Sequence, residues 1–301
     1  MTDLPAHFAK TIIGVYGPAG ATWLDTLHAR LARILDRYDL TLGAPFALSY
    51  NYVTAATRSD GTPVVLKLGV PDGGIQDEIA ALRHYDGNGM VALLEADADE
   101  GLMILERVLP GTPLSKLADD DQATHHAATV MRSLWRLLPP DHPFGTVQKW
   151  SQGLQRLRDN FEGETGPLPA HHIERAEAIY RDLFASAPPA VLLHGDLHHE
   201  NMLTSTRLPY LAIDPKGVAG EPCYEIGPLL LNPQPAVYFW PNLAQVQARR
   251  IAILVERLQL DRERLLACAY AHSVLSAAWT LEDHGDGWED AILVADTLLH
   301  L

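Results

Sequence analysis

Two short stretches decide the fold of this 301-residue chain. Residues 192–203 read LLHGDLHHENML, and residues 211–217 read LAIDPKG. Each opens with an apolar run typical of a buried strand, and each run ends in a carboxylate, Asp196 in the first stretch and Asp214 in the second. Asn201 follows Asp196 after four intervening residues. The sequence therefore holds three polar side chains at the ends of apolar segments.

These three side chains match what phosphoryl transfer requires. The reaction needs a carboxylate to receive the proton of the attacking hydroxyl, and oxygen ligands that hold magnesium against the nucleotide phosphates. Asp196 and Asn201 have the spacing of a kinase catalytic loop, and Asp214 lies where a second metal ligand should come. Asp and Asn are also common in hairpin turns, and a His-Gly-Asp triplet alone would indicate only a loop. The whole combination is much rarer and favours a catalytic site.

Residues 194–203 and 213–217 resemble the aminoglycoside phosphotransferase superfamily, and most of all its aminoglycoside/hydroxyurea resistance kinases, the streptomycin phosphotransferase branch. The resemblance extends over nearly the whole chain. It implies an α+β fold of the protein-kinase-like, two-lobe type, with ATP and Mg²⁺ as cofactors. It also implies that Asp196 is the catalytic base and that Asn201 and Asp214 are the metal ligands.

The length of the chain predicts two packed lobes, because 301 residues exceed the usual size of a single core. Pro110 and Gly111 mark the boundary between them. We expect a small nucleotide-binding β-meander lobe over residues 1–108. A mainly helical lobe that carries catalysis and acceptor binding should follow over residues 109–301.

Composition narrows the class of partner. A net charge of −15 disfavours nucleic acid and anionic membranes, and it would attract a cationic ligand, although acidity is also common among soluble proteins. The chain has no apolar run of 18 residues, and its first ten residues lack the apolar region of a secretory signal. We expect a cytoplasmic protein, monomeric or weakly dimeric, with Cys223 and Cys268 as buried thiols.

The first lobe opens with a glycine-containing segment, residues 11–20, that is no Walker loop because no lysine follows its last glycine. We expect a turn there, and then a helix from Trp23 to Tyr38. The lobe should continue as strands and one helix. The expected strands span residues 42–47, 52–57, 63–70, 91–94 and 102–106, and the helix spans residues 75–85.

Nucleotide contacts are expected on these elements. Lys67 lies on the third strand, where a kinase carries its phosphate-binding lysine, and Glu78 lies at the distance expected for its ion-pair partner. An edge-strand lysine facing water is the plain alternative for Lys67 alone. The turn before residue 52 lacks the kinase glycine pattern, so phosphate coverage would rely on backbone amides or on Ser49 and Asn51. By resemblance, the backbone groups of two residues at the end of the last strand should contact adenine: Glu106 and Val108.

The second lobe should be dominated by helices. The periodic apolar pattern predicts them over residues 119–138, 147–161, 171–187, 243–258, 261–282 and 288–299. His171 and His172 could bind metal, but adjacent residues on a helix point about 100° apart. A surface pair at the start of a helix is therefore expected.

The segment over residues 218–228 stands where kinases carry an activation loop. It is short, it has no basic cluster for a phosphorylated residue, and Asp-Pro-Lys replaces the usual Asp-Phe-Gly. We expect an enzyme that is always active. Glu225 in this segment resembles a family carboxylate that braces the catalytic loop, with a solvent-facing glutamate or an acceptor contact as alternatives.

An acidic, tryptophan-containing stretch over residues 279–290 is the expected acceptor-binding loop. Its carboxylates Glu282, Asp283 and Asp286 could bind guanidinium groups, and tryptophan faces attract cations. The alternative is a solvated turn, in which case recognition would fall to His198 and Glu200 beside the catalytic loop.

We therefore expect ATP- and magnesium-dependent transfer of the γ-phosphoryl group to a hydroxyl of a small cationic molecule, foremost a streptomycin-type aminoglycoside. The alternatives are a kinase of a metabolite, such as an amino sugar or a hydroxyurea-like compound, and a catalytically silent nucleotide-binding relative.

Overall fold

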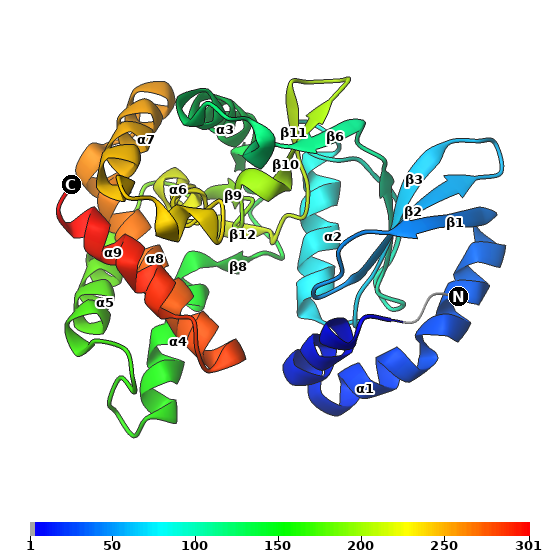
Figure 1. The fold of residues 1–301 in the computed structure, drawn as a ribbon, viewed down its shortest axis with the longest axis horizontal. Helices are drawn as coiled ribbons and strands as arrows, with labels where there is room; N and C mark the ends of the chain where they lie inside the picture. Colours follow the sequence, from blue (N-terminus) through cyan, green and yellow to red (C-terminus); the bar gives the residue numbers. More distant parts are fainter. Residues whose placement is uncertain (1–3) are drawn as a thin grey trace. The chain divides into compact units, whose positions relative to one another are not determined.

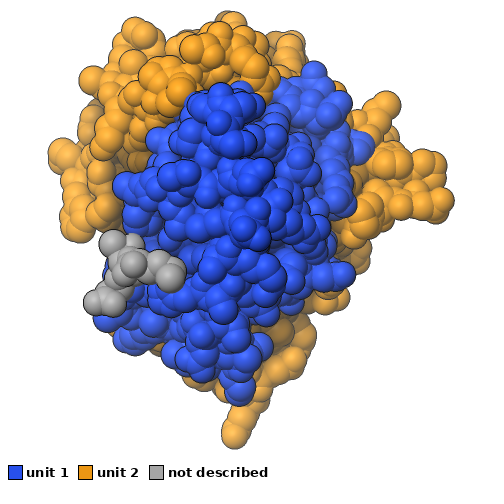
Figure 2. Space-filling view, turned by 90° about the vertical axis from the view of Figure 1, so that its right-hand side faces the viewer, with its two compact units in different colours: residues 1–108 blue, residues 109–301 orange. Residues whose placement is uncertain are grey.

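The computed structural model describes residues 4–301, so the first three residues of the amino-terminal segment considered above lie outside it. The chain forms two compact units, residues 1–108 (unit 1) and residues 109–301 (unit 2), which Figure 2 distinguishes by colour. Each unit has its own architecture.

Unit 1 is built on a five-stranded antiparallel sheet with the strand order β1-β2-β3-β5-β4 (Figure 1). Its strands lie within about three residues of their predicted positions, and burial alternates most clearly along β2, whereas β5 is buried almost throughout. The strands span Leu40–Pro45 (β1), Tyr52–Arg58 (β2), Pro63–Leu68 (β3), Leu93–Asp97 (β4) and Leu102–Glu106 (β5).

A long helical segment, α1 (Ala6–Arg37), lies alongside this sheet (Figure 1). The prediction of a turn over residues 11–20 was wrong over most of its length, because helix begins at Ala6 and is interrupted only at Gly17, with φ 55° and ψ −133°, before Pro18. At Gly20 an added Cβ would lie 2.4 Å from the carbonyl oxygen of Ile12, so only glycine allows the two halves to pack this closely.

Strand alternation separates two faces of the sheet. Val64, Leu66 and Leu68 of β3 belong to the hydrophobic cluster that includes buried side chains of α1. Lys67 lies between two of these residues in sequence and therefore points to the opposite face. Helix α2 (Gly73–Tyr85), whose first turn is capped by Asp72, carries Glu78.

Unit 2 is mainly helical, and α8 lies at its centre, packed against α4, α5, α6 and α9 (Figure 1). Most predicted helices lie within two residues of their expected bounds. The helices are α3 (Asp120–Leu134), α4 (Val147–Asn160), α5 (Ala170–Ala185), α6 (Ile226–Leu230), α7 (Leu243–Leu258), α8 (Arg262–His284) and α9 (Glu289–Leu299), with short 3-10 turns η1 (Leu114–Lys116), η2 (His199–Asn201), η3 (Pro222–Glu225) and η4 (Ala236–Phe239).

Helix α3 is shorter than predicted. It ends at Leu134, and the next residues join a small sheet through Arg136 and Leu137 instead of continuing the helix. That pairing satisfies backbone groups that a longer helix would have paired internally.

Two small sheets carry the polar stretches of unit 2. Their strand orders are β11-β10-β6 and β7-β9-β12-β8. The strands span Pro110–Pro113 (β6), Arg136–Leu137 (β7), Gly145–Thr146 (β8), Val191–Leu193 (β9), Met202–Ser205 (β10), Tyr210–Ala212 (β11) and Val218–Gly220 (β12). Among residues 4–301, no helix combines the length and the apolar character needed to cross a bilayer.

Candidate functional site

The catalytic loop predicted from the sequence joins β9 to β10 through η2. Gly195 takes a φ of +85°, a conformation that favours glycine. An added Cβ there would lie 2.7 Å from the Trp150 ring and 3.0 Å from Val218. Glycine at this position therefore lets the chain turn sharply against its neighbours and delivers the next residue, Asp196, at the end of a buried strand.

Asp196 is accessible, with 37% of its side chain exposed, and two cationic or protonatable groups face it. Its Oδ2 lies 3.8 Å from the Lys216 Nζ, and its Oδ1 lies 3.7 Å from the His198 Nε2. Partial burial raises the pKa of Asp196 above its usual value, while Lys216 and His198 act in the opposite direction. An accessible carboxylate with a raised pKa is suited to accept a proton.

A backbone hydrogen bond orients the imidazole ring of His198. Its Nδ1 accepts a hydrogen bond from the amide of Glu200 at 3.2 Å, and its Nε2 lies 3.2 Å from the Asn201 Nδ2 and 3.7 Å from the Asp196 Oδ1. Glu200 is exposed. The His198 ring thus lies next to both Asp196 and Asn201.

Asn201 is buried, and its amide group donates to the backbone carbonyl of Asp196 at 2.9 Å. That bond fixes the side chain across the catalytic loop. Because the bond uses Nδ2, the amide oxygen remains available as an acceptor or ligand.

Asp214 follows β11 and adopts the left-handed backbone region, with φ 61°. Its Oδ2 lies 3.0 Å from the Lys216 Nζ, so the same ammonium group faces both carboxylates of the site. Backbone bonds join the stretches: Ile213 donates to the carbonyl of Asn201 at 3.0 Å, and Lys216 and Gly217 donate to that of His194 at 2.7 and 3.3 Å. The structure therefore brings Asp196, Asn201 and Asp214 into one place.

His194 links the two stretches through its ring. Its Nδ1 accepts from the amide of Asp196 at 3.2 Å, which places the ring proton on Nε2, and Nε2 donates to the carbonyl of Ile213 at 2.8 Å. Burial lowers the pKa of His194 to about 3, so the ring is neutral at physiological pH. His194 is a structural link and not a proton carrier.

Glu225 stabilises the catalytic loop from the interior of unit 2. It is completely buried, and its two carboxylate oxygens accept from the amides of His194 at 2.7 Å and Gly195 at 2.9 Å. Burial raises its pKa to about 7, against the effect of these two bonds. Both the solvent-facing alternative and the placement of Glu225 among acceptor contacts were wrong, because its oxygens are occupied in the interior. The bracing role is the one the structure supports.

In unit 1, Lys67 and Glu78 form a buried ion pair. The Lys67 Nζ lies 2.7 Å from both Glu78 oxygens, and the two side chains are only 6% and 7% exposed. Leaving either charge buried without the other would be costly. The edge-strand alternative for Lys67 was therefore wrong, since β3 lies between β2 and β5.

The other predicted nucleotide contacts lie at the ends of strands of unit 1. Ser49 is exposed, and Asn51 is half-buried with its side chain against Gly69, where an added Cβ would lie 2.3 Å from its Oδ1. The carboxylate of Glu106 accepts from the amide of Ala92 at 3.0 Å, and Val108 is buried. Their nucleotide roles stay predictions.

Comparison with known proteins identifies the family. The profile of the aminoglycoside/hydroxyurea antibiotic resistance kinases matches residues 43–284. The chain is 31% identical to a streptomycin 6-kinase of Streptomyces glaucescens, over 94% of this chain and 92% of that protein. It is 33% identical to a hydroxyurea phosphotransferase of Kitasatospora aureofaciens, over 99% and 86% respectively.

The chain belongs to the aminoglycoside/hydroxyurea antibiotic resistance kinase family. This confirms the resemblance carried by residues 194–203 and 213–217, and with it the prediction of a small-molecule kinase.

Solved structures support the fold of this resistance-kinase chain. An aminoglycoside phosphotransferase in ternary complex with ADP and hygromycin B has a TM-score of 0.61 at 16% identity, over 89% of this chain and 96% of that one. The choline kinase LicA of Streptococcus pneumoniae has a TM-score of 0.64 at 13% identity, over 90% and 99%. At these identities the likeness concerns the fold alone, and it confirms the predicted protein-kinase-like α+β class.

The donor set of this family member fits magnesium. The amide oxygen of Asn201 and the carboxylate of Asp214 are hard oxygen ligands of the kind that Mg²⁺ prefers, and two protein ligands are typical where phosphates and water supply the rest. The Asn201 amide is oriented for this use by its bond to Asp196. Lys216, 3.0 Å from Asp214, adds a cation to the same place.

A pocket of about 300 Å³ in unit 2 opens beside Asp196. Sequence reasoning missed most of its wall. Trp150 and Trp279 meet there edge to face, 5.7 Å apart at 84°. Trp279 belongs to the stretch 279–290, in which the sequence predicted acceptor contacts, whereas Trp150 gave no signal beyond that of a core residue. The other lining residues are Gly195, Asp196, Lys216, Pro228, Leu231, Asn232, Gln234, His272 and Ser276.

The carboxylates of the acidic stretch at the end of α8 are not part of this wall. Glu282, Asp283 and Asp286 are exposed, and none of them lines the pocket at Asp196. Glu282 instead forms two bonds of 3.1 Å with Arg156. Partial burial raises the pKa of Asp283. The structure thus places these three carboxylates apart from the predicted catalytic group.

A buried arginine that the sequence did not reveal contacts the catalytic loop at His199. The Arg250 guanidinium is completely buried, pairs with Asp120, donates to the carbonyl of Asn232 at 2.8 Å, and lies 3.4 Å from the His199 Nε2. Asp120 is therefore more than part of the predicted helix cap, which Asp119 alone provides. The sequence did not predict that Arg250 is buried, because an arginine in a helix is usually a surface residue.

Proposed function

We propose that this protein is an ATP- and magnesium-dependent kinase that phosphorylates a hydroxyl of a streptomycin-type aminoglycoside. The observation that carries the proposal is the convergence of Asp196, Asn201 and Asp214, which supplies a proton acceptor and hard oxygen ligands in one place.

Each residue has a distinct part. Asp196 orients the acceptor hydroxyl and accepts its proton, while Asn201 and Asp214 hold magnesium, which when bound neutralises charge on the nucleotide phosphates. In unit 1, Lys67 contacts the phosphates and Glu78 holds Lys67 in place. Backbone groups of Glu106 and Val108 contact adenine, and the turn with Ser49 and Asn51 covers the phosphates.

Lys216 is an addition that the sequence did not suggest. Its ammonium lies 3.0 Å from Asp214 and 3.8 Å from Asp196, so it can approach the group being transferred. A cation there stabilises the negative charge that the transition state spreads over the phosphoryl oxygens. We assign it that role.

The acceptor binds in the pocket beside Asp196. Streptomycin carries guanidinium groups, and the Trp150 and Trp279 rings offer faces that attract cations. Asn232 and Gln234 add amide groups that can bond to sugar hydroxyls. Because the carboxylates Asp283 and Asp286 do not line this pocket, they serve at most as a peripheral attraction for the cation.

A hydroxyurea-like acceptor is the second candidate. It is favoured by the 33% identity to the hydroxyurea phosphotransferase and by a pocket at the lower end of the volume range for drug-sized ligands. A small uncharged acceptor would gain little from two tryptophan faces, which is why the aminoglycoside is preferred.

The decisive experiment measures ADP release by a coupled assay with streptomycin, other aminoglycosides, hydroxyurea and amino sugars, after subtraction of the rate without acceptor. We expect streptomycin to give the highest kcat/KM of these acceptors. Turnover of hydroxyurea alone would assign the second candidate, and the absence of stimulation by every acceptor would contradict the proposal.

A pair of variants then separates the pocket from the acidic stretch. Trp279→Leu should raise the KM for a cationic acceptor by about 5- to 30-fold, from the loss of roughly 1–2 kcal/mol of cation–aromatic attraction, and leave the KM for ATP unchanged. Asp283→Asn should change the acceptor KM less than threefold. If Asp283→Asn raised the acceptor KM more than Trp279→Leu did, residues 282–286 would be the acceptor-binding residues instead.

A further inference from the structure

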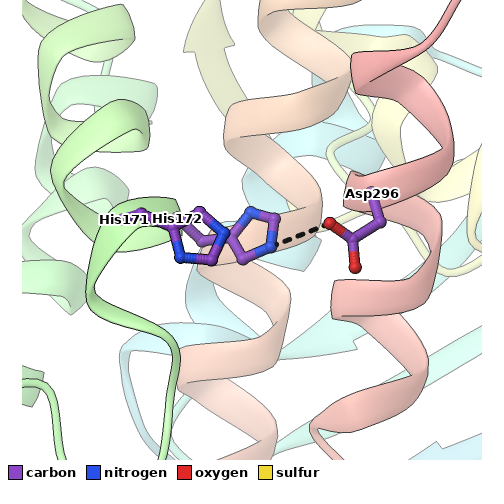
Figure 3. A group of neighbouring side chains, drawn as sticks. All are labelled: His171, His172 and Asp296. Carbon is purple, nitrogen blue, oxygen red and sulfur yellow. Dashed lines mark ion pairs between the residues drawn. The ribbon is translucent and has the colours of Figure 1, made fainter.

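A second cluster of potential ligands lies in unit 2 outside the catalytic stretches. His171 and His172 come from the first turn of α5, and Asp296 comes from α9 (Figure 3). One donor atom of each side chain lies within 4.8 Å of the other two. Two imidazoles and a carboxylate from two helices thus converge, although they are far apart in sequence.

The two histidines do not diverge as expected for neighbours on a helix. Their ring centroids are 4.2 Å apart, and the ring planes are inclined by 36° (Figure 3). The prediction of a simple surface pair was wrong for His172, which is only 1% exposed. Side-chain rotation at the start of α5 brings the rings together on the side that faces α9.

His172 is held between two polar partners. Its Nδ1 lies 2.7 Å from the hydroxyl of Tyr270 on α8, and its Nε2 lies 3.1 Å from the Oδ1 of Asp296. Because the carboxylate can only accept, Nε2 donates to Asp296 and Nδ1 accepts from Tyr270 in the metal-free chain. A metal on Nε2 would replace that proton, and Nδ1 would then donate to Tyr270. Metal-binding histidines commonly fix their tautomer through such a bond of the second ring nitrogen.

We propose that His171, His172 and Asp296 form a binding site for a divalent transition metal of the zinc class. A ligand set of two imidazoles and a carboxylate suits zinc, cobalt or nickel, whereas magnesium and calcium prefer oxygen ligands alone. Three protein ligands leave a fourth position for water.

Small adjustments complete the geometry. Ligand atoms bound about 2.0–2.2 Å from zinc lie no more than about 4 Å apart. His171 and Asp296 are exposed, so they can rotate by the required amount and the ion can enter from solvent. The buried His172 provides the fixed ligand around which the other two close.

The site connects elements that support the catalytic unit. Helices α5 and α9 both pack against α8, and Trp279 of α8 lines the pocket at Asp196. A metal bridge between α5 and α9 would tie the outer helices together around α8. We therefore assign it a stabilising role, separate from the magnesium of the transfer reaction.

The test uses the full chain, stripped with a chelator and free of nucleotide. Zinc is added in steps, and binding is followed by isothermal titration calorimetry and by thermal unfolding. One equivalent should bind and raise the Tm, and the chelator should reverse the shift. Magnesium at the same concentrations should not displace the bound zinc. Cobalt should produce the visible absorption of a site with nitrogen ligands.

Variants locate the bound ion. His171→Ala and Asp296→Asn alter exposed side chains, so they should fold normally and weaken zinc binding by at least about tenfold, while Tyr270→Phe should weaken it by about 10- to 100-fold through loss of the partner of His172. Matched controls are Asp182→Asn, exposed on the same helix α5, and His28→Ala, exposed on α1. Both should bind zinc as the parent does.

Two results would overturn the assignment. One is the absence of stoichiometric zinc binding by the parent. The other is zinc binding that His171→Ala and Asp296→Asn both leave unchanged, because the ion would then occupy other histidines. Neither result bears on the proposed kinase activity, since no readout depends on turnover.

Discussion

The Lys67 ammonium lies 2.7 Å from both carboxylate oxygens of Glu78, and the pair is almost completely withdrawn from solvent. Lys67→Met should therefore destabilise the chain by about 3–5 kcal/mol, because it leaves a buried carboxylate without its partner. Urea unfolding measures this loss. Arg37→Met is the matched control, because Arg37 pairs with Asp97 while 59% exposed, and its removal should cost less than about 1 kcal/mol. Equal losses in the two variants would contradict the importance of burial.

Asp196→Asn should lower kcat by about 10²- to 10⁴-fold, because the amide cannot accept the proton of the acceptor hydroxyl. The affinity for ATP should change little, since the proposed magnesium ligands remain. Steady-state kinetics separates these effects. Asp286→Asn, an exposed carboxylate outside the pocket, controls for loss of negative charge. If Asp196→Asn retains the parent turnover, another group is the base.

Asp214→Asn should reduce the thermal stabilisation by MgATP. Asparagine tolerates the left-handed conformation at this position, so the backbone should persist while the charge that attracts magnesium is lost. At about 100 times the dissociation constant, MgATP should stabilise the parent by about 2.7 kcal/mol. Differential scanning fluorimetry with MgATP, and with ATP in EDTA, shows the difference. An unchanged MgATP effect in the variant would remove Asp214 from the metal site.

Acid should destabilise the fold through His272. Burial lowers its pKa from 6.5 to about 4. The unfolded chain therefore binds a proton at higher pH than the folded chain, and stability is lost as the pH falls from about 6.5 toward 4. Between pH 7 and pH 5 this one group should remove about 2 kcal/mol. Between pH 7 and pH 5, the free energy of unfolding of His272→Gln should fall by about 2 kcal/mol less than that of the parent. This difference does not depend on the stability of the variant at pH 7. Identical pH dependence in urea unfolding would show that His272 does not contribute.

Arg250→Lys should destabilise unit 2 even though it retains the charge. A lysine cannot reproduce the planar guanidinium that pairs with Asp120 and donates to the carbonyl of Asn232. The loss should approach the 3–5 kcal/mol of a broken buried pair. Arg249→Lys next to it is the control, since Arg249 and Asp121 are both 48% exposed. Chemical unfolding of the two variants should differ by at least about 2 kcal/mol.

Sequence reasoning succeeded where a local pattern has a single physical solution. The strand alternation around Lys67 and the helical periodicity after residue 243 produced elements close to those observed. The spacing of Asp196, Asn201 and Asp214 predicted a convergence that the backbone bonds between the two stretches create. Family membership separately confirms the class of small-molecule kinase that these residues indicated.

The failures involve contacts between distant segments. Gly14, Gly17 and Gly20 led to the prediction of a turn at the start of α1. In the structure only Gly17 interrupts the helix. The acidic stretch 282–286 attracted attention by its composition, whereas the pocket wall draws on separated helices. Arg250 could not be recognised as buried, because its partner Asp120 lies 130 residues away.

The segment after Asp214 has a further consequence for the cell. Strand β12 is paired on both sides, with β9 and with β8, and η3 follows it directly with the buried Glu225. A segment fixed in a sheet offers no flexible loop for covalent modification to order. Since Glu225 already braces the catalytic loop in this state, we expect turnover to follow the concentrations of nucleotide and acceptor without prior modification of this segment.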